Sequence, residues 1–339
     1  MRDHDPTQGE KPTIGEWCDH WVEHMIRGRR TPDTYRTYRT RIDHAITPAI
    51  GGIRIDLIRP SHLDRLDRYE KDKSAATRTL TLTVLRQALR AARAEGLIDR
   101  NPAETTDPPQ GETIRRDALT PGQAKDVIRL EPDPQLRLLW RLLFTTGMRI
   151  GETAGLTPNE IRHVDGTTVI MVVQQARRLP HTTGEDMPDG YQTGDWGDGW
   201  KLTRTKTRKG MRAIPLPDRL ARDLETHIRE HGIAPDRPVF TTRRGNPMGR
   251  ENARQQWRRA LGRAGLPPLP LHTTRHTMAT MLARNHVPDT LRKALIGHAR
   301  IDTTDDIYTH LDAGTVKPAI QTIDRLLEDD DTGLEKEKE

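Results

Sequence analysis

The sequence contains a single cysteine, Cys18, among its 339 residues. One cysteine cannot form a disulfide within the chain, and it cannot supply the cysteine ligands of a structural zinc site. Such scarcity is typical of proteins that stay in a reducing compartment, so we expect a cytoplasmic protein.

Long apolar stretches are also missing. Only 33% of the residues are hydrophobic, two are Phe, and the mean hydropathy is −0.80. No stretch approaches the roughly 20 apolar residues that a membrane-spanning helix needs. The first twelve residues contain no apolar segment of the kind found in secretory signals, so we expect neither a membrane protein nor a signal peptide.

Basic residues are abundant and unevenly distributed. The chain has 55 Lys and Arg against 49 Asp and Glu, a net charge of +6. The last twelve residues, 328–339, hold seven acids and two bases, which leaves 53 bases against 42 acids elsewhere, a net +11. Of the 55 bases 44 are Arg, whose planar guanidinium suits phosphate better than the lysine ammonium does. This balance is typical of nucleic-acid-binding proteins, but a GC-rich genome also enriches arginine, and composition leaves both explanations open.

The length favours two domains, and a stretch rich in Pro, Thr and Gly without periodicity separates them. The pattern predicts a polar tail at 1–12, a helical domain at 13–103, a linker at 104–117, a second domain at 118–327 and an acidic tail at 328–339.

Arginines recur on the helices predicted for the first domain. Arg36 and Arg39 lie mostly opposite an apolar face, and Arg86, Arg90 and Arg93 follow a spacing of i, i+4, i+7. Such a row is either a solvated face or a row of phosphate contacts, and the sequence gives the two interpretations equal weight.

The second domain combines helices and strands. An apolar helix around residues 136–144 is the strongest core signal in the chain. Residues 168–173 and 202–216 read as strands, and the Gly- and Asp-rich stretch 179–200 between them as a loop. The acids of that loop are expected to be solvated rather than to bind a metal: Asp186, Asp189, Asp195 and Asp198.

Five short segments of the second domain carry residue types suited to phosphate chemistry. Each is weak by itself: this composition gives about two His-x-x-Arg pairs by chance, and there are three, beginning at His24, His62 and His272. Their order along the chain is the stronger signal. The segments are TTGMRIGE at 145–152, RTKTRKGMRAIPLP at 204–217, LHTTRH at 271–276, LIGH at 295–298 and TTDDIYTH at 303–310.

In order and in flanking residues, these segments resemble the catalytic domain of the tyrosine recombinases, also called the phage integrase family, over about residues 119–327. The resemblance fills all six catalytic positions of that family: Arg149, Lys206, His272, Arg275, His298 and Tyr308. It implies a mainly α-helical fold with a small antiparallel sheet, in which a helical core-binding domain precedes an α+β catalytic domain.

The resemblance also implies a role for each residue. Tyr308 would be the nucleophile that forms a covalent link to DNA, and Lys206 would protonate the leaving 5′ oxygen. Arg149 and Arg275 would bind the non-bridging phosphate oxygens in bidentate fashion. His272 and His298 would donate hydrogen bonds to the same phosphate. No metal or other cofactor is required.

Further residues are expected to support these six. Glu152, one helical turn after Arg149, would orient that guanidinium or a neighbouring group, although a simple i, i+3 ion pair is the plainer explanation. The predicted DNA contacts are Arg36, Arg39, Arg86, Arg90, Arg93 and Lys209.

The implied function is site-specific recombination through a 3′-phosphotyrosyl intermediate and Holliday-junction strand exchange. Its partners would be duplex DNA with specific sites and a homotetramer on that DNA, assisted in some systems by a DNA-bending or directionality factor. We then expect a bacterial, nucleoid-associated integrase of a mobile element. The alternatives are DNA relaxation like that of a type IB topoisomerase, and a DNA-binding regulator without catalysis.

Overall fold

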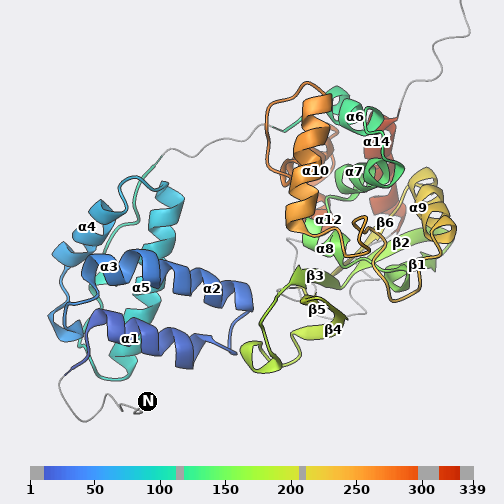
Figure 1. Ribbon diagram of the computed structural model, residues 1–339. Helices are drawn as coiled ribbons and strands as arrows, with labels where there is room; N and C mark the ends of the chain where they lie inside the picture. Colours follow the sequence, from blue (N-terminus) through green and yellow to red (C-terminus); the bar gives the residue numbers. More distant parts are fainter. Residues whose placement is uncertain (1–10, 112–117, 206–210, 297–312, 329–339) are drawn as a thin grey trace, which may run out of the picture. The chain divides into compact units, whose positions relative to one another are not determined.

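The computed structural model describes residues 11–111, 118–205, 211–296 and 313–328, and the chain divides into two compact units. The first comprises Met1–Arg115 together with His181–Tyr191, and the second comprises Arg116–Pro180 together with Gln192–Glu339. Each unit packs around its own hydrophobic core, so each is described by itself (Figure 1).

The first unit is built from helices. They are α1 (Ile14–Trp21), the π-helical turn η1 (Val22–Ile26), α2 (Pro32–Arg41), the π-helical turn η2 (Ile42–Ile46), α3 (Thr47–Ile50), the 3-10 turn η3 (Ile55–Leu57), α4 (Pro60–Tyr69), α5 (Ala75–Ala94) and the 3-10 turn η4 (Pro102–Glu104). The 3-10 turn η6 (Gly184–Asp186) also belongs to this unit.

Local sequence signals explain where these helices begin and how they pack. Thr13 caps α1 in a capping box with Glu16, and Ser74 caps α5 by accepting from the Thr77 N–H. Trp17 is buried in the core and donates its indole N–H to the Ala88 carbonyl of α5 at 2.8 Å. The predicted helical first domain is therefore present, and Arg86, Arg90 and Arg93 lie on its long helix α5.

The second unit contains helices and two small sheets. Its helices are α6 (Pro121–Arg129), α7 (Pro134–Thr146), α8 (Ile150–Ala154), the 3-10 turn η5 (Pro158–Glu160), α9 (Asp218–Glu230), α10 (Arg250–Arg263), α11 (Thr273–Arg284), α12 (Asp289–Ile296) and α14 (Ala313–Leu327). The strands are β1 (Ile161–Val164), β2 (Thr167–Val172), β3 (Gln174–Arg178), β4 (Gln192–Gly197), β5 (Trp200–Arg204) and β6 (Arg212–Pro215).

Both sheets are antiparallel and three-stranded, with the orders β1-β2-β6 and β3-β5-β4 (Figure 1). The chain leaves the first sheet after Val172 and enters the second at Gln174. The mainly helical fold with antiparallel strands agrees with the predicted fold class, with two small sheets in place of one.

Two expectations about the strands are wrong. The stretch 202–216 is not one strand, because β5 and β6 belong to different sheets. Residues 192–197 are not loop, because they form β4 and pair with β5 through two irregularities in register. The Gly- and Asp-rich composition hides this strand, since those residues are depleted in sheets and its pairing depends on bulges.

The helices of the second unit pack around one hydrophobic core. Trp140 and Phe144 of α7 pack against Trp257 of α10, and α7 also contacts α11 and α14. Ile320 and Ile323 of α14 are fully buried in the same core, so this helix packs on its own unit. In the part of the chain that the structure describes, no helix is both long and apolar enough to cross a bilayer.

Candidate active site

The site begins at the turn between α7 and α8. Gly147 ends α7 in a left-handed conformation with φ of +61°. A Cβ there would be strained and would lie 3.2 Å from the sulfur of Met278. This turn places Arg149 at the N-cap of α8 and turns the Gly147 carbonyl toward Arg275.

The carboxylate of Glu152 is the centre of the site. Its side chain is only 3% exposed and accepts from Nη1 of Arg149 at 2.8 Å and from the backbone N–H of Arg149, also at 2.8 Å. Burial by itself would raise the pKa of Glu152, but the charge and hydrogen bonds of Arg212, together with Arg149, lower that pKa to about 2. Glu152 is therefore ionised at neutral pH.

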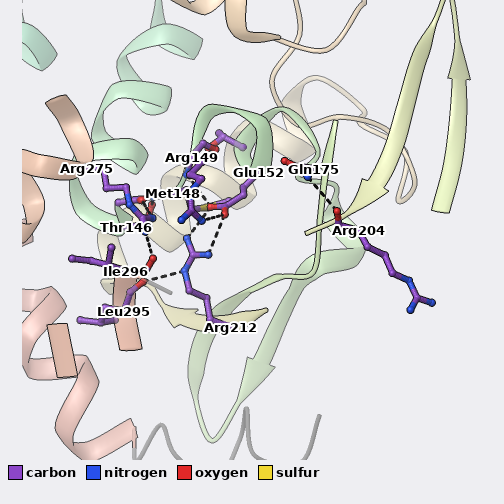
Figure 2. A network of polar contacts seen from close by, with 12 residues as sticks. Thr146, Met148, Arg149, Glu152, Gln175, Arg204, Arg212, Arg275, Leu295 and Ile296 are labelled. Atoms are coloured by element: carbon purple, nitrogen blue, oxygen red, sulfur yellow. Dashed lines mark hydrogen bonds and ion pairs between the residues drawn. The ribbon is translucent and has the colours of Figure 1, made fainter. Parts of the chain in front are cut away.

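Arg212, the first residue of β6, also reaches this carboxylate (Figure 2). Its side chain is 1% exposed, with Nη2 at 2.8 Å from Oε2 and Nη1 at 3.3 Å from Oε1 of Glu152. Its Nε donates to the Leu295 carbonyl of α12 at 3.0 Å. One guanidinium thus joins α8, β6 and the end of α12.

Arg275 of α11 lies beside this network (Figure 2). It is 4% exposed and donates Nη1 to the Gly147 carbonyl at 2.7 Å and Nη2 to the Ile296 carbonyl. Burial and the neighbouring charges of Arg149 and Arg212 lower the pKa of Arg275 to about 9, so the guanidinium remains charged at neutral pH.

The site has an excess of positive charge. Among the described residues, three guanidinium groups, those of Arg149, Arg212 and Arg275, lie around the one carboxylate of Glu152, which leaves a net +2. Their mutual repulsion would be relieved by a bound anion. Arg149, whose side chain is 44% exposed, can present donors to a ligand while its neighbours remain buried. The geometry fits charge stabilisation at a phosphate.

The structure brings some of the predicted residues together. Arg149, Glu152 and Arg275 meet, and His272 is exposed at the start of α11, three residues before Arg275. Four predicted residues lie outside the described residues: Lys206, Lys209, His298 and Tyr308.

The residues on both sides of the 206–210 segment make hydrogen bonds near this site. Before it, Gln175 of β3 donates to the Arg204 carbonyl at 3.2 Å, and the side chain of Arg204 points away from the arginine cluster (Figure 2). After it, Arg212 is the buried residue described above.

Sequence reasoning did not single out Arg212. The available signal was an arginine at the beginning of a strand, RAIP, in which all four residues are buried. An arginine is seldom buried without a partner, so burial of the whole strand would imply a carboxylate or carbonyl nearby. The burial itself could not be read from the sequence.

The arginines predicted to contact DNA in the first unit have partners within that unit. Arg36 pairs with Asp33 at 2.7 Å, and Arg39 pairs with Asp19 at 2.8 Å. Arg86 donates to the backbone carbonyls of Ala103 at 2.6 Å and Thr106 at 3.0 Å, and Glu104 is shared by Arg90 and Arg93. A role in DNA binding remains a prediction for all five.

A second group of arginines lies on α10 and was not predicted as a DNA-binding surface. Arg250, Arg254 and Arg258 are exposed at a spacing of i, i+4, i+8, while Trp257 faces the core. Arg254 lies 3.8 Å from the exposed Glu251. Within the described ranges, no carboxylate is within 4.0 Å of the Arg250 or Arg258 guanidinium. This face is called the α10 arginine row.

Comparison with known proteins adds to this geometry. Residues 126–314 match the phage integrase family, and residues 13–74 match the phage integrase N-terminal SAM-like domain. The chain is 25% identical over 342 residues to a XerC-like tyrosine recombinase of Caldanaerobacter subterraneus subsp. tengcongensis, covering 93% of this chain and 83% of that protein. It is 24% identical over 342 residues to an integrase of Streptomyces ambofaciens, with coverage of 95% and 82%.

Solved structures share the fold. The integrase of the Tn1549 transposon in complex with a circular intermediate DNA has a TM-score of 0.69 at 19% identity, covering 89% of this chain and 99% of that one. A lambda integrase from a tetramer bound to a Holliday junction has a TM-score of 0.63 at 21% identity, with coverage of 89% and 83%.

Proposed function

Because the chain belongs to the phage integrase family and is a tyrosine-type site-specific DNA recombinase, we propose that Arg149 and Arg275 hold the scissile phosphate of its DNA. Tyrosine recombinases break and rejoin DNA through a covalent 3′-phosphotyrosyl intermediate and exchange strands through a Holliday junction. Such a reaction conserves the bond energy of the phosphodiester, because one ester replaces another.

The observation that carries the proposal is the arginine cluster around Glu152. A phosphodiester in transfer gathers charge on its non-bridging oxygens, and fixed guanidinium groups in a buried site neutralise that charge without reorganisation. Arg149 and Arg275 come from two segments 126 residues apart and both lie next to the α7–α8 turn. Glu152 holds the Arg149 guanidinium in place by the 2.8 Å contact.

The remaining roles rest on the sequence resemblance. The Tyr308 oxygen attacks phosphorus, the bond to the 5′ oxygen breaks, and Lys206 supplies the proton that the leaving oxygen takes. His272 and His298 donate hydrogen bonds to the phosphate. Rejoining is the reverse reaction, in which a 5′ hydroxyl attacks phosphorus and the Tyr308 oxygen leaves.

The partners follow from the same assignment. We propose duplex DNA with specific sites as the substrate and a tetramer on that DNA as the active assembly, in service of the integration of a mobile element. The α10 arginine row adds a candidate surface for the DNA backbone, because its cations are exposed and only one has a carboxylate of the described residues nearby. An accessory factor that bends DNA or sets direction would act beside this tetramer.

Mapping covalent complexes tests the proposal. The wild-type protein and Tyr308→Phe are each incubated with sheared genomic DNA of the source organism, denatured, and the protein-linked fragments are sequenced. We expect wild-type adducts at one or a few sites and none from Tyr308→Phe. Adducts scattered over all sequences would instead indicate a relaxing topoisomerase, and sequence-specific binding without any adduct would indicate a regulator.

A further inference from the structure

Arg212 lies where three of the predicted catalytic segments meet. The carboxylate of Glu152 accepts hydrogen bonds from Nη1 of Arg149 and from both terminal nitrogens of Arg212. The Leu295 carbonyl, which Arg212 also binds, is three residues before His298 in the chain. Arg212 itself follows Lys206 by six residues. The Arg212 side chain therefore links all three segments.

We propose that Arg212 is a positioning residue for the recombination reaction, acting through Glu152 on the guanidinium of Arg149. This inference rests on the proposed function. Among the described residues, the donors of the buried Arg212 reach the carboxylate of Glu152 and the Leu295 carbonyl, so we assign its effect to those groups. Without Arg212, the Glu152 carboxylate would have fewer partners fixing its two oxygens, and Arg149 would lose its fixed orientation.

An arginine suits this position better than a lysine. The planar guanidinium binds both oxygens of Glu152 while its Nε reaches a carbonyl on α12, so three contacts are fixed by one rigid group. A lysine ammonium keeps the charge but cannot make this bidentate contact. Arg212→Lys therefore removes the bidentate contact with Glu152 while keeping the positive charge at this position.

Arg141 of α7 provides a matched control. It is also a mostly buried arginine, with 11% exposure, and pairs at 2.8 Å with the buried Asp324 of α14. Its ion-pair partners among the described residues are Asp223, Asp324 and Glu328, and none of these three is a predicted catalytic residue. Arg141→Lys is expected to lower stability while leaving the chemistry of the folded protein unchanged.

The experiment measures covalent-complex formation on a nicked suicide duplex, built on the sequence at which the wild-type adduct maps. Misplacement of a catalytic group by about 1 Å can cost about 10²-fold, so we expect Arg212→Lys to react about 10²-fold more slowly. DNA affinity should stay within about threefold, because phosphate contacts dominate affinity. Arg141→Lys should react at the wild-type rate. Equal rates for Arg212→Lys and wild type would overturn the inference.

Two altered substrates show how Arg212 acts. A methylphosphonate at the scissile position removes the phosphate charge that Arg149 would neutralise, so the deficit of Arg212→Lys should shrink by about tenfold or more. A sulfur in place of the leaving 5′ oxygen needs no protonation, so on this substrate the deficit should persist. If the rate of Arg212→Lys relative to wild type is the same on the methylphosphonate as on the normal duplex, Arg212 has a merely structural role. If Arg212→Lys reacts as fast as wild type on the 5′-sulfur substrate, its effect lies at the Lys206 turn. Either result contradicts the proposal.

A second variant covers a failure of Arg212→Lys to fold. Glu152→Gln keeps the shape of the side chain and weakens its link to both arginines, and it should show the same response to the two substrates. If Glu152→Gln forms covalent complexes at the wild-type rate on all three substrates, the inference is overturned. If the wild-type protein forms no adduct at any site, the proposed function itself fails, whereas normal wild-type adducts with an unimpaired Arg212→Lys reject only the role of Arg212.

Discussion

Two buried ion pairs of the second unit have the same chemistry and opposite surroundings. Glu152 is one carboxylate among three arginines, Arg149, Arg212 and Arg275. Arg141 is one arginine among three carboxylates, with Asp324 at 2.8 Å, Asp223 at 3.3 Å and Glu328 at 3.6 Å. Counted over the described residues, the first cluster has cations in excess and the second has anions in excess.

The pKa values of the two acids respond in opposite directions. Burial would raise the pKa of Glu152, but Arg212 and Arg149 lower it to about 2. Burial raises the pKa of Asp324, and Arg141 does not fully offset it while Glu328 adds to it. The role of a buried ion pair therefore depends on the charges around it. The cluster around Glu152 keeps a positive charge that can bind an anion, whereas the cluster around Arg141 links α14 to α7.

The largest expected effect separates the two clusters by catalysis. Arg149→Ala and Arg275→Ala should each slow covalent-complex formation by at least about 10²-fold, because each removes a fixed donor from the phosphate. Arg141→Ala should slow it by less than about twofold once the folded fraction is taken into account. Single-turnover rates on the suicide duplex measure this difference.

An Arg141→Ala rate as low as that of Arg149→Ala would remove the distinction between the clusters. Circular dichroism of each variant at the assay temperature is the control for folding.

Acid should act on the two pairs with opposite sign. The stability that Glu152 contributes is present above its ordinary pKa of 4.5 and is lost as the pH falls toward 2. The stability advantage of wild type over Glu152→Gln should thus shrink by about 2 kcal/mol between pH 5 and pH 3. Denaturant unfolding at each pH measures this change.

Asp324 has a raised pKa, so its ionised form is disfavoured in the folded protein. Wild type should gain stability relative to Asp324→Asn as the pH falls through this raised pKa. If the stability of wild type relative to Glu152→Gln and relative to Asp324→Asn changes in the same direction as the pH falls, the two surroundings do not differ as described.

The α10 arginine row extends the comparison to exposed cations. Arg254→Ala and Arg258→Ala should each weaken DNA binding by roughly threefold to tenfold and lower the slope of log affinity against log salt by about one. Fluorescence anisotropy over a salt series measures both quantities. An unchanged slope would exclude these side chains as phosphate contacts.

The smallest effect is expected at Arg36, which is already paired with Asp33 at 2.7 Å on the surface. Arg36→Ala should change DNA affinity by less than about twofold and stability by less than about 0.5 kcal/mol. The same anisotropy series checks it. A salt slope lowered by one would instead make Arg36 a phosphate contact, as predicted from its place on the face opposite the apolar residues.

Local signals made much of the fold predictable. Thr120 followed by Pro121 predicts a helix start, and Thr120 indeed caps α6 in a capping box with Gln123. The apolar residues Val84, Leu85, Ala88, Leu89 and Ala92 recur at helical spacing and predict a helix over 75–95, which is α5. β4 was missed because its composition is that of a loop and its strand character comes from pairing with β5.

The candidate site was predictable only in part. Arg149 and Arg275 were found by the order of the segments along the chain, and Glu152 by its helical spacing from Arg149. Arg212 was missed because its partners are Glu152 and the Leu295 carbonyl, 60 and 83 residues away in sequence. Contacts of this kind depend on tertiary packing, which no local pattern encodes.

We propose that the Tyr308 oxygen forms the covalent bond to DNA. The most direct measurement is mass spectrometry of the wild-type adduct after nuclease and protease digestion. We expect a nucleotide remnant on the peptide that contains Tyr308. A remnant on any of the other four tyrosines, Tyr35, Tyr38, Tyr69 or Tyr191, would contradict it.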